Sequence, residues 1–214
     1  MSDQLTSREG TRERIVEAAR ELFFEQGYNA TGMSQILNRA EANSGSLYHF
    51  FQTKEDLLVA VLEKYKLMLC PMVIEPAKQR ASDPVDRLFA ILMGYRMLLE
   101  ATEFRLGCPI GNLALELSNS HPRARQLIEE NFEGWVGEVR AIVDEVSDRL
   151  PEGMDAECVA TLLLSAMEGG VMLARTYRSL EPFDRTVHAV RLMFDQLVRG
   201  GSEWSAPLTA TSTP

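Results

Sequence analysis

Residues 46–57, SLYHFFQTKEDL, decide the fold of this chain. Two positions in or just before this stretch favour the start of a helix: Asn43 can cap a helix that runs to about Phe50, and Thr53 can cap the next one. Asp56 stands three positions after Thr53, which resembles a capping box with aspartate in the acidic place. The stretch therefore predicts a short helix followed closely by another.

A further short helix is expected before the one that Asn43 caps. Thr31 can cap it, and Glu41-Ala42 then form a tight turn. Two short capped helices separated by a turn of about three residues have the spacing of a helix-turn-helix. In that motif the first turn of the second helix reaches base edges, and the flanking groups hold phosphates.

The second helix of this motif has an inward side and an outward side. We place Leu47 and Phe51 inward, so that Tyr48 and His49 point outward. Two exposed rings with hydrogen-bonding tips suit contacts with phosphates or bases. The alternative is that Tyr48 and His49 are ordinary surface residues of a helical hairpin.

The rest of the chain is expected to be helical. Apolar residues recur at the helical period in every long segment, and none alternates convincingly at period two. Gly27 supplies the left-handed position that ends the first helix, and Pro71 and Pro76 end or bend the fourth. Asp83 and Asp155 can cap later helices. We therefore expect an all-α fold, with helices over residues 11–26, 31–40, 43–50, 53 to about 70, 84–99, 110–117, 122–150, 155–173 and 184–199.

The charge of the chain limits where nucleic acid can bind. The net charge is −9; the first 54 residues contain six basic and seven acidic residues, so they carry −1 and the remainder carries −8. This balance argues against nonspecific nucleic-acid binding by the whole chain. A DNA-binding surface must be a local patch, with the acidic remainder facing away from the phosphates.

Several classes of site are missing from the sequence. The three histidines have no HExxH or paired spacing, and there is neither a glycine-rich phosphate loop nor a GxSxG motif, so we do not expect an enzyme. The three cysteines are far apart without a CxxC pair, which argues against disulfides and a zinc site, and no cofactor is predicted. No run of 18 or more apolar residues and no signal-peptide stretch appears, so we expect a cytoplasmic protein without a membrane partner.

The stretch at residues 46–57 resembles the signature small-LYHYF-x-[SN]-KE-x-L of the TetR family of transcriptional regulators. It lies at the expected distance from IVEAARELF at residues 15–23 and from GYNAT at residues 27–31. The resemblance covers residues 11–62. It implies an N-terminal three-helix DNA-binding domain at residues 8–54 and a C-terminal helical domain for effector binding and dimerisation at residues 55–200. The tail at residues 201–214 is expected to be disordered.

The resemblance also implies partners and contact residues. It implies a homodimer that binds double-stranded operator DNA and leaves it when a small-molecule effector or a thiol-reactive compound arrives. The matched positions assign phosphate contacts to Tyr48, Lys54 and the capping Thr31. They assign contacts with bases or the nearby backbone to Asn43, Ser44, Ser46 and His49, and a weaker candidate is Gln35.

This chain departs from the family pattern at the turn of the motif. Glu41 stands where glycine is usual and Ala42 where valine is usual, and Asn43-Ser44 replace a common Ser-Lys pair. Glu41 therefore needs an unusual backbone conformation and brings a negative charge toward DNA. Two alternatives stay open: a helical adaptor that kept the fold without binding DNA, and an activator instead of a repressor.

The last two long helices are expected to form the dimer interface. In the family this pair dimerises, and here one helix is small on one side, at Ala166, Gly169, Gly170 and Ala174. Small residues allow helices to approach closely, and a four-helix interface built from two copies of the pair follows. The final helix has an apolar face at Val187, Val190, Phe194 and Leu197. The alternative is that these faces pack within one subunit.

The effector is expected to bind among the middle helices. Residues 107–117, GCPIGNLALEL, are similar to a segment found in a TetR subgroup that controls detoxification of reactive electrophiles. In some of its members the cysteine matched by Cys108 is the sensing thiol, and a helix N-terminus there would lower its pKa. The alternative is a small buried hydrophobe. The candidate effector contacts are Met68, Met93, Tyr95, Phe104, Cys108, Asn112, Trp135 and Met167.

Overall fold

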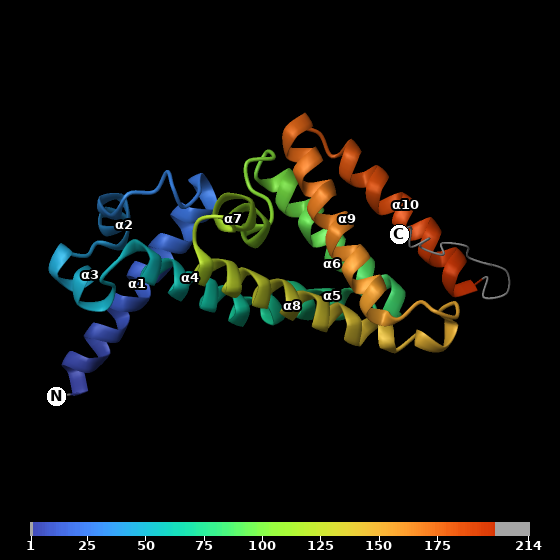
Figure 1. Ribbon diagram of the computed structural model, residues 1–214, viewed down its shortest axis with the longest axis horizontal. Helices are drawn as coiled ribbons and strands as arrows, with labels where there is room; N and C mark the ends of the chain where they lie inside the picture. The colour runs from blue at the N-terminus through green and yellow to red at the C-terminus, as the bar shows by residue number, and fades with distance from the viewer. Residues whose placement is uncertain (1, 200–214) are drawn as a thin grey trace, which may run out of the picture.

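The computed structural model describes residues 2–199 and contains helices but no strand within that range, which confirms the all-α fold. The tail at residues 201–214, expected to be disordered, lies outside the described residues. The elements follow one another as α1 (Ser2–Gln26), α2 (Met33–Ala40), α3 (Ser44–Phe50), α4 (Lys54–Leu69), the π-helical turn η1 (Cys70–Ile74), α5 (Glu75–Arg80), α6 (Pro84–Ala101), α7 (Pro109–Leu117), α8 (Pro122–Asp144), the 3₁₀ turn η2 (Ser147–Arg149), α9 (Ala156–Tyr177) and α10 (Glu181–Arg199) (Figure 1).

The predicted helix caps are confirmed around α3 and α4. The Asn43 side chain accepts a hydrogen bond from the Ser46 amide at 2.8 Å. Thr53 and Asp56 form the reciprocal capping box, with the Asp56 amide donating to Thr53 Oγ1 at 3.1 Å and the Thr53 amide donating to Asp56 Oδ2 at 3.0 Å. The side chains of Asp83 and Asp155 accept hydrogen bonds from the amides of Asp86 and Cys158 and cap α6 and α9 without a reciprocal bond.

The prediction that Thr31 caps α2 is wrong. The residue before α2 is Gly32, and the Gln35 side chain reaches back to accept from the Gly32 amide at 2.7 Å. The Thr31 hydroxyl instead donates to the Gly27 carbonyl at 2.7 Å. This local bond closes the turn after α1, so the cap and the start of α2 lie one residue later than expected.

The prolines after α4 do not break the helical path. The chain continues from α4 through η1 into α5, with Pro71 and Pro76 near the starts of η1 and α5. Helix α4 therefore ends just before Pro71, as expected, and a wider π turn accommodates the missing backbone donor while the chain continues helically. The long helix expected to run to Leu150 instead ends at Asp144 and is followed by η2.

Two hydrophobic cores hold these helices together. The first contains the buried faces of α1 to α4 and also Leu113 and Leu117 of α7 and Ala124 and Ile128 of α8. The second joins η1, α5, α6, α8, α9 and α10. The first core therefore crosses the predicted domain boundary at residue 54, and α4, α7 and α8 connect the N-terminal helices with the rest of the protein (Figure 1).

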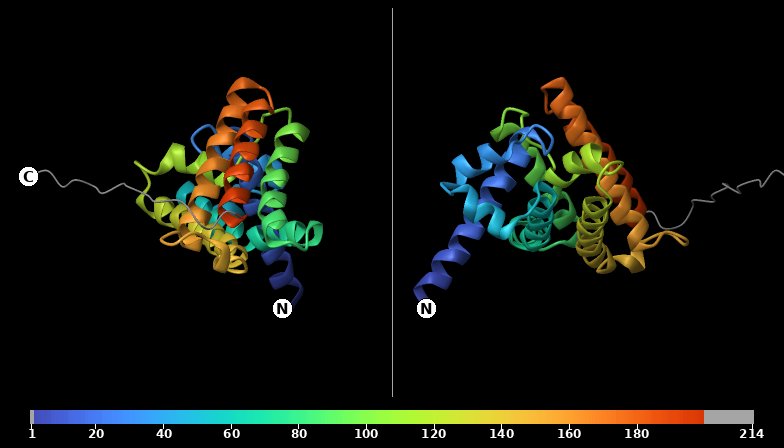
Figure 2. Two further views of the ribbon diagram at one scale, coloured as in Figure 1. Left: turned by 90° about the vertical axis from the view of Figure 1, so that its right-hand side faces the viewer. Right: turned by 60° about the vertical axis from the view of Figure 1, so that its left-hand side comes forward.

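The side of α9 that has small residues packs against other helices of the same chain. A Cβ added to Gly170 would lie 2.9 Å from the ring of Phe183 at the start of α10, and Ala174 and Phe194 are buried in the second core. At these positions the structure favours the alternative of packing within one subunit. Other apolar residues of the pair are exposed, among them Leu162, Leu173, Leu192 and Met193. The two helices themselves lie at the outer edge of the molecule (Figure 2).

One helix among the described residues, α9, is long and apolar enough to cross a membrane by length and composition alone. A core helix of a soluble protein has the same properties. Because α9 contacts α6, α8 and α10 and contributes a row of buried residues to the second core, its apolar character is explained by packing.

Candidate functional site

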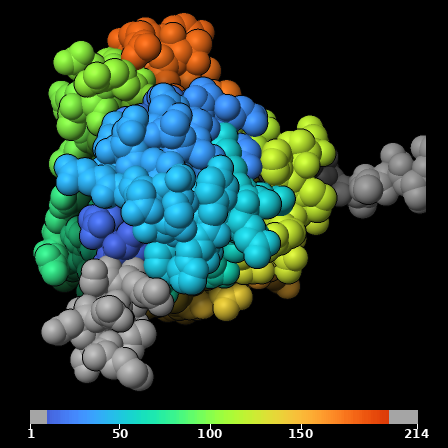
Figure 3. Space-filling model, turned by 90° about the vertical axis from the view of Figure 1, so that its left-hand side faces the viewer, coloured from blue at the N-terminus to red at the C-terminus, as the bar shows by residue number. Residues whose placement is uncertain are grey.

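Helix α3 presents a polar face at one end of the molecule, where α2 and α3 form the centre of the surface (Figure 3). Leu47 and Phe51 are buried, as expected, and Tyr48 and His49 are exposed, with 56% of Tyr48 accessible. Ser44 is exposed in the first turn, while Ser46 is half-buried. The exposed face therefore offers a phenol, an imidazole and small hydroxyl groups to a ligand outside the protein.

The turn between α2 and α3 has the backbone that its sequence requires. Glu41 has φ 49 and ψ 46, in the left-handed region that glycine adopts most easily, so the unusual conformation expected there is confirmed. The Glu41 side chain is exposed and adds a negative charge beside α3. Arg14 of α1 donates from Nε to the carbonyl of Ala40 at 3.3 Å, which holds the turn against α1.

Two residues that were predicted to contact phosphate form contacts within the protein instead. Thr31 is only 1% exposed, so the prediction that its hydroxyl reaches phosphate is wrong for this conformation. The Lys54 ammonium donates to the Tyr28 carbonyl and lies 4.1 Å from the centroid of the Tyr28 ring. Its partial burial lowers the pKa of Lys54. A phosphate contact by Lys54 stays a prediction and requires it to share or leave the Tyr28 carbonyl.

The other predicted DNA contacts have mixed surroundings. Gln35 is exposed, but its side-chain oxygen accepts from Gly32 and from Gln26. The side-chain oxygen of Asn43 is engaged at the cap of α3 while the residue itself is exposed. The side-chain oxygens of Gln35 and Asn43 therefore stabilise the starts of α2 and α3 in this structure.

Two cations near α3 were missed by the sequence reasoning. Arg12 lies with its guanidinium carbon 5.4 Å from the centroid of Phe51 and is exposed, and Arg14 is exposed beside the turn. Both belong to α1, so no pattern within residues 31–54 could have found them. Arg39 of α2 is less available, since it pairs with Glu21 and Glu25.

A cavity of about 400 Å³ lies among α1, α4, α6, α8 and α9, and we call it the central cavity. Five of the eight predicted effector contacts line it: Met68, Tyr95, Cys108, Trp135 and Met167. The sequence reasoning missed the other polar lining residues, which are Arg20, Tyr65, Arg80, Asn131 and Glu168. Most of the remaining lining is apolar, which is typical of a site for a small organic ligand.

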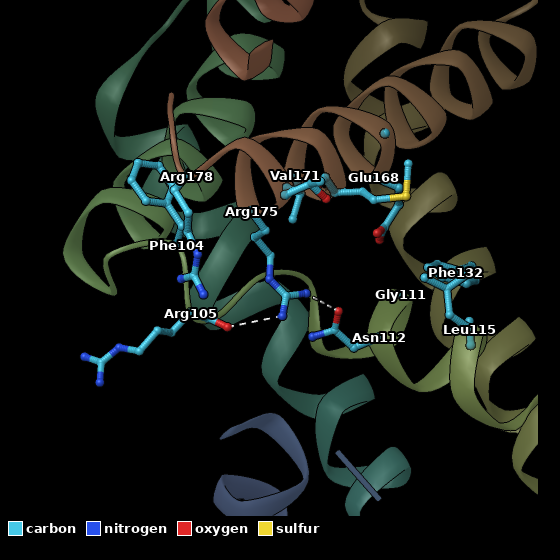
Figure 4. A pocket seen from close by; sticks show the side chains of 14 residues that line it. Phe104, Arg105, Gly111, Asn112, Leu115, Phe132, Glu168, Val171, Arg175 and Arg178 are labelled. Atoms are coloured by element: carbon cyan, nitrogen blue, oxygen red, sulfur yellow. Dashed lines mark hydrogen bonds between the residues drawn. The ribbon is translucent and has the colours of Figure 1, made fainter. Parts of the chain in front are cut away.

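A second hollow, the lateral pocket of about 510 Å³, takes two of the other predicted contacts, Phe104 and Asn112 (Figure 4). Arg175 crosses it and donates to Asn112 Oδ1 at 2.6 Å and to the Arg105 carbonyl at 3.2 Å. Exposed residues line much of this pocket, so it is a surface hollow. Met93 is exposed and lines neither the central cavity nor the lateral pocket.

Cys108 sits at the N-terminus of α7 but does not have the predicted low pKa. It is 5% exposed, and its sulfur accepts from the Gly111 amide at 3.4 Å. Burial raises the pKa of the Cys108 thiol, and the negative charge of Glu168 raises it further. The expected lowering by the helix terminus is therefore outweighed by desolvation and by a like charge.

Helix α7 also contacts the loop between α1 and α2. Glu116 accepts hydrogen bonds from the amides of Tyr28 at 2.9 Å and of Asn29 at 2.6 Å. Gly27 permits this approach, since it has φ 88 and a Cβ there would lie 3.0 Å from Glu116 Oε2. The ring of His121 meets Tyr28 edge-on, with centroids 5.2 Å apart.

Comparisons with known proteins decide the family. Residues 15–61 match the family described as "Bacterial regulatory proteins, tetR family", and residues 84–189 match "Transcriptional regulator LmrA/YxaF-like, C-terminal domain". The chain is 30% identical to the uncharacterized HTH-type transcriptional regulator YxaF of Bacillus subtilis, over 83% of this chain and 92% of that protein. The chain belongs to the TetR family.

Other TetR-family relatives extend the likeness over most of the chain. The HTH-type transcriptional repressor DhaR of a Mycobacterium species is 26% identical, over 86% of this chain and 92% of that protein. The crystal structure of a TetR regulator from Chloroflexus aurantiacus is 27% identical, with a TM-score of 0.77 over 90% of this chain and 98% of that one. This TetR-family chain is therefore a helix-turn-helix transcriptional regulator. Regulators of this family are typically repressors that bind operator DNA and small-molecule effectors as dimers.

Proposed function

We propose that this regulator is a homodimeric repressor that binds its operator through α3 and leaves it when a small molecule enters the central cavity. The observation that carries the proposal is that an exposed, polar α3 and a largely apolar cavity occur in one chain, joined by α7 and by the first core. Like its relatives with transcription-factor names, it is expected to work in the cytoplasm. Repression is favoured over activation because the relative DhaR is named a repressor.

The effector is proposed to act by shifting populations. The cavity does not include α3, so a ligand there does not cover the DNA-binding face. It lowers operator affinity only if it binds more tightly to conformations in which α3 is misplaced. By linkage, operator DNA must then weaken ligand binding by the same factor.

DNA selection tests the proposal as a whole. Genomic fragments are incubated with the full-length protein, and retained fragments are sequenced. We expect an inverted repeat whose half-sites are about one helical turn, roughly 34–36 Å, apart or more if the recognition helices are splayed. Retention of fragments without any shared motif would favour the adaptor alternative.

Tyr48→Phe isolates the phenol hydroxyl. We expect operator affinity to fall about three- to tenfold on every operator sequence, because one hydrogen bond to phosphate is lost while the ring stays. Equilibrium titration of labelled operator measures it. Tyr177→Phe is the matched control, since Tyr177 is 68% exposed at the C-terminal end of α9. Equal affinities of wild type and Tyr48→Phe would remove Tyr48 from the interface.

Cys108 distinguishes a reversible ligand from a thiol-reactive one. With N-ethylmaleimide on the folded protein, we expect Cys108 to be modified at least about tenfold more slowly than Cys158. Both thiols have a raised pKa, but Cys108 is buried while Cys158 is exposed to the reagent. Peptide mass spectrometry over time measures both rates. We also expect Cys108→Ser to keep its response to a reversible effector. Rapid modification of Cys108, together with loss of reagent-induced release in Cys108→Ser, would instead establish a thiol sensor.

A further inference from the structure

Unpartnered polar atoms gather in the central cavity. Among residues 2–199, five buried side-chain nitrogen or oxygen atoms lack a hydrogen-bond partner, and three of them line this cavity: Tyr65 Oη, Trp135 Nε1 and Glu168 Oε1. The other two belong to Arg87 and Arg175, whose terminal nitrogens are paired. Buried polar groups are almost always hydrogen-bonded, so this concentration points to a ligand that completes them.

The three groups differ in what they require. Tyr65 and Trp135 are 8% and 4% exposed. The Trp135 N–H can only donate, and burial raises the pKa of Tyr65 to about 12, so that its hydroxyl also keeps a proton. Both can donate to an oxygen of a ligand. Glu168 is different, because an ionised carboxylate only accepts and also requires a positive charge nearby.

Glu168 has no cation to pair with in this part of the protein. It is the one carboxylate among the described residues that line the central cavity. Arg20, which also lines it, donates twice to Glu17 and lies over the Tyr65 ring. Arg80 is exposed. Burial raises the pKa of Glu168, and the interaction of its carboxylate with the Cys108 thiol offsets only part of that rise.

We propose that the effector is a small amphiphilic amine whose protonated nitrogen donates to Glu168 Oε1 in the central cavity. Its apolar body packs on Met68, Met167 and the aromatic rings, and an oxygen in that body accepts from Trp135 or Tyr65. The rings of Tyr95 and Trp135 favour a cation by their negative faces. This inference rests on the proposed function, in which the same cavity takes the effector. An anionic ligand would meet the charge of Glu168, while the cations among the described lining residues are Arg20, which pairs with Glu17, and Arg80, which is exposed.

The position of Glu168 explains how such a ligand would be sensed. The residue lines both the central cavity and the lateral pocket (Figure 4), so it stands in the wall between them. A Cβ added to Gly111 would lie 2.2 Å from Glu168 Oε2, so the carboxylate rests directly against α7. Turning Oε1 toward an ammonium group moves a side chain that touches α7.

The test uses three ligands of one size and different charge: 3-phenoxypropylamine, 3-phenoxypropan-1-ol and 3-phenoxypropanoate. Binding is followed by the fluorescence of Trp135 in a Trp204→Phe background, because the chain has two tryptophans. We expect the amine to bind at least about tenfold more tightly than the alcohol or the acid, as a charge-assisted hydrogen bond predicts. In Glu168→Gln the preference for the amine over the alcohol should fall to near one.

A matched control distinguishes the effect of losing the Glu168 carboxylate from the effect of changing the net charge. Glu133→Gln removes one negative charge from an exposed position on α8 that does not line the central cavity, and it should keep the preference for the amine. Thermal melting of both variants checks their folding. Equal binding of amine and alcohol by the wild type, tighter binding of the acid, no binding of the amine, or an unchanged preference in Glu168→Gln would each overturn the proposal.

Operator titrations of the same proteins without ligand keep this proposal apart from the proposed function. If the wild type binds operator normally but shows no preference for the amine, the proposal of an amine effector is rejected and the proposed repressor function is unaffected. If the protein binds the amine through Glu168 but retains no specific DNA, the proposed repressor function is rejected and the amine site in the central cavity is supported.

Discussion

Replacing both Leu173 and Leu192 by glutamate is expected to produce a monomer and to lower operator affinity at least about hundredfold, since two linked half-sites lose their shared binding. The two leucines are 39% and 52% exposed on α9 and α10, which lie side by side at the outer edge of the molecule (Figure 2). Contiguous exposed apolar surface marks an interface. Glutamates there would leave four uncompensated charges in the contact of two copies.

Sedimentation at micromolar concentration measures the mass, and titration of labelled operator measures the affinity. Leu67→Glu is the control, because Leu67 of α4 is 78% exposed and lies outside the pair of helices. It should leave the protein dimeric. A double variant that still sediments as a dimer and binds operator normally would place the interface elsewhere.

Local features of the fold could be predicted from the sequence. The inward position of Leu47, the exposure of Tyr48 and the cap at Asn43 follow from periodicity and from bonds that span three residues. The left-handed conformation of Glu41 followed from a residue that stands where glycine is usual. The first three depend on neighbours in the chain, which the sequence displays directly, whereas the conformation of Glu41 was expected from the family pattern.

Contacts between distant segments could not be predicted. The small side of α9 was expected at the dimer interface, but Gly170 receives Phe183 of the same chain. Helical period identifies an apolar or small face without identifying its partner. Glu168 was missed for the same reason, since only the packing of α7 against α9 shows that its carboxylate is buried without a counter-ion.

Thr31 shows a different limit. Its type and place favour a cap, yet its hydroxyl is used by the Gly27 carbonyl, so Gly32 and Gln35 start α2 instead. Threonine hydroxyls form both kinds of local bond with similar ease. Only the conformation of the preceding turn decides between them.

Helix α7 is placed to connect ligand and operator. Near its N-terminus, Gly111 lies against Glu168 in the wall of the central cavity. Near its other end, Glu116 accepts the amides of Tyr28 and Asn29, in the loop that joins α1 to α2. A shift of α7 by a ligand would therefore change two hydrogen bonds of the DNA-binding helices. These bonds are the most direct polar link between α7 and the helix-turn-helix in the part of the chain that the structure describes.

Glu116→Ala is therefore expected to weaken operator binding without ligand by about tenfold, because two charge-assisted hydrogen bonds that hold the loop are lost. Ligand affinity should not fall, since Glu116 does not line the central cavity and the loosened conformations are those that the ligand favours. The factor by which 3-phenoxypropylamine lowers operator affinity should shrink, because the variant already has the loosened loop. Operator titrations with and without the amine give that factor, and linkage requires the same factor in the amine's affinity with and without operator.

Glu129→Ala, at an exposed position on α8, removes the same charge; it should keep the coupling factor and leave operator affinity equal to or slightly above that of the wild type. Removing a negative charge alone would strengthen binding to DNA, so a weaker complex in Glu116→Ala has to arise from the loop. If instead Glu116→Ala keeps the full coupling factor, the signal does not pass through these bonds. It then runs along α4, which reaches from the cap at Thr53 to Met68 in the cavity wall.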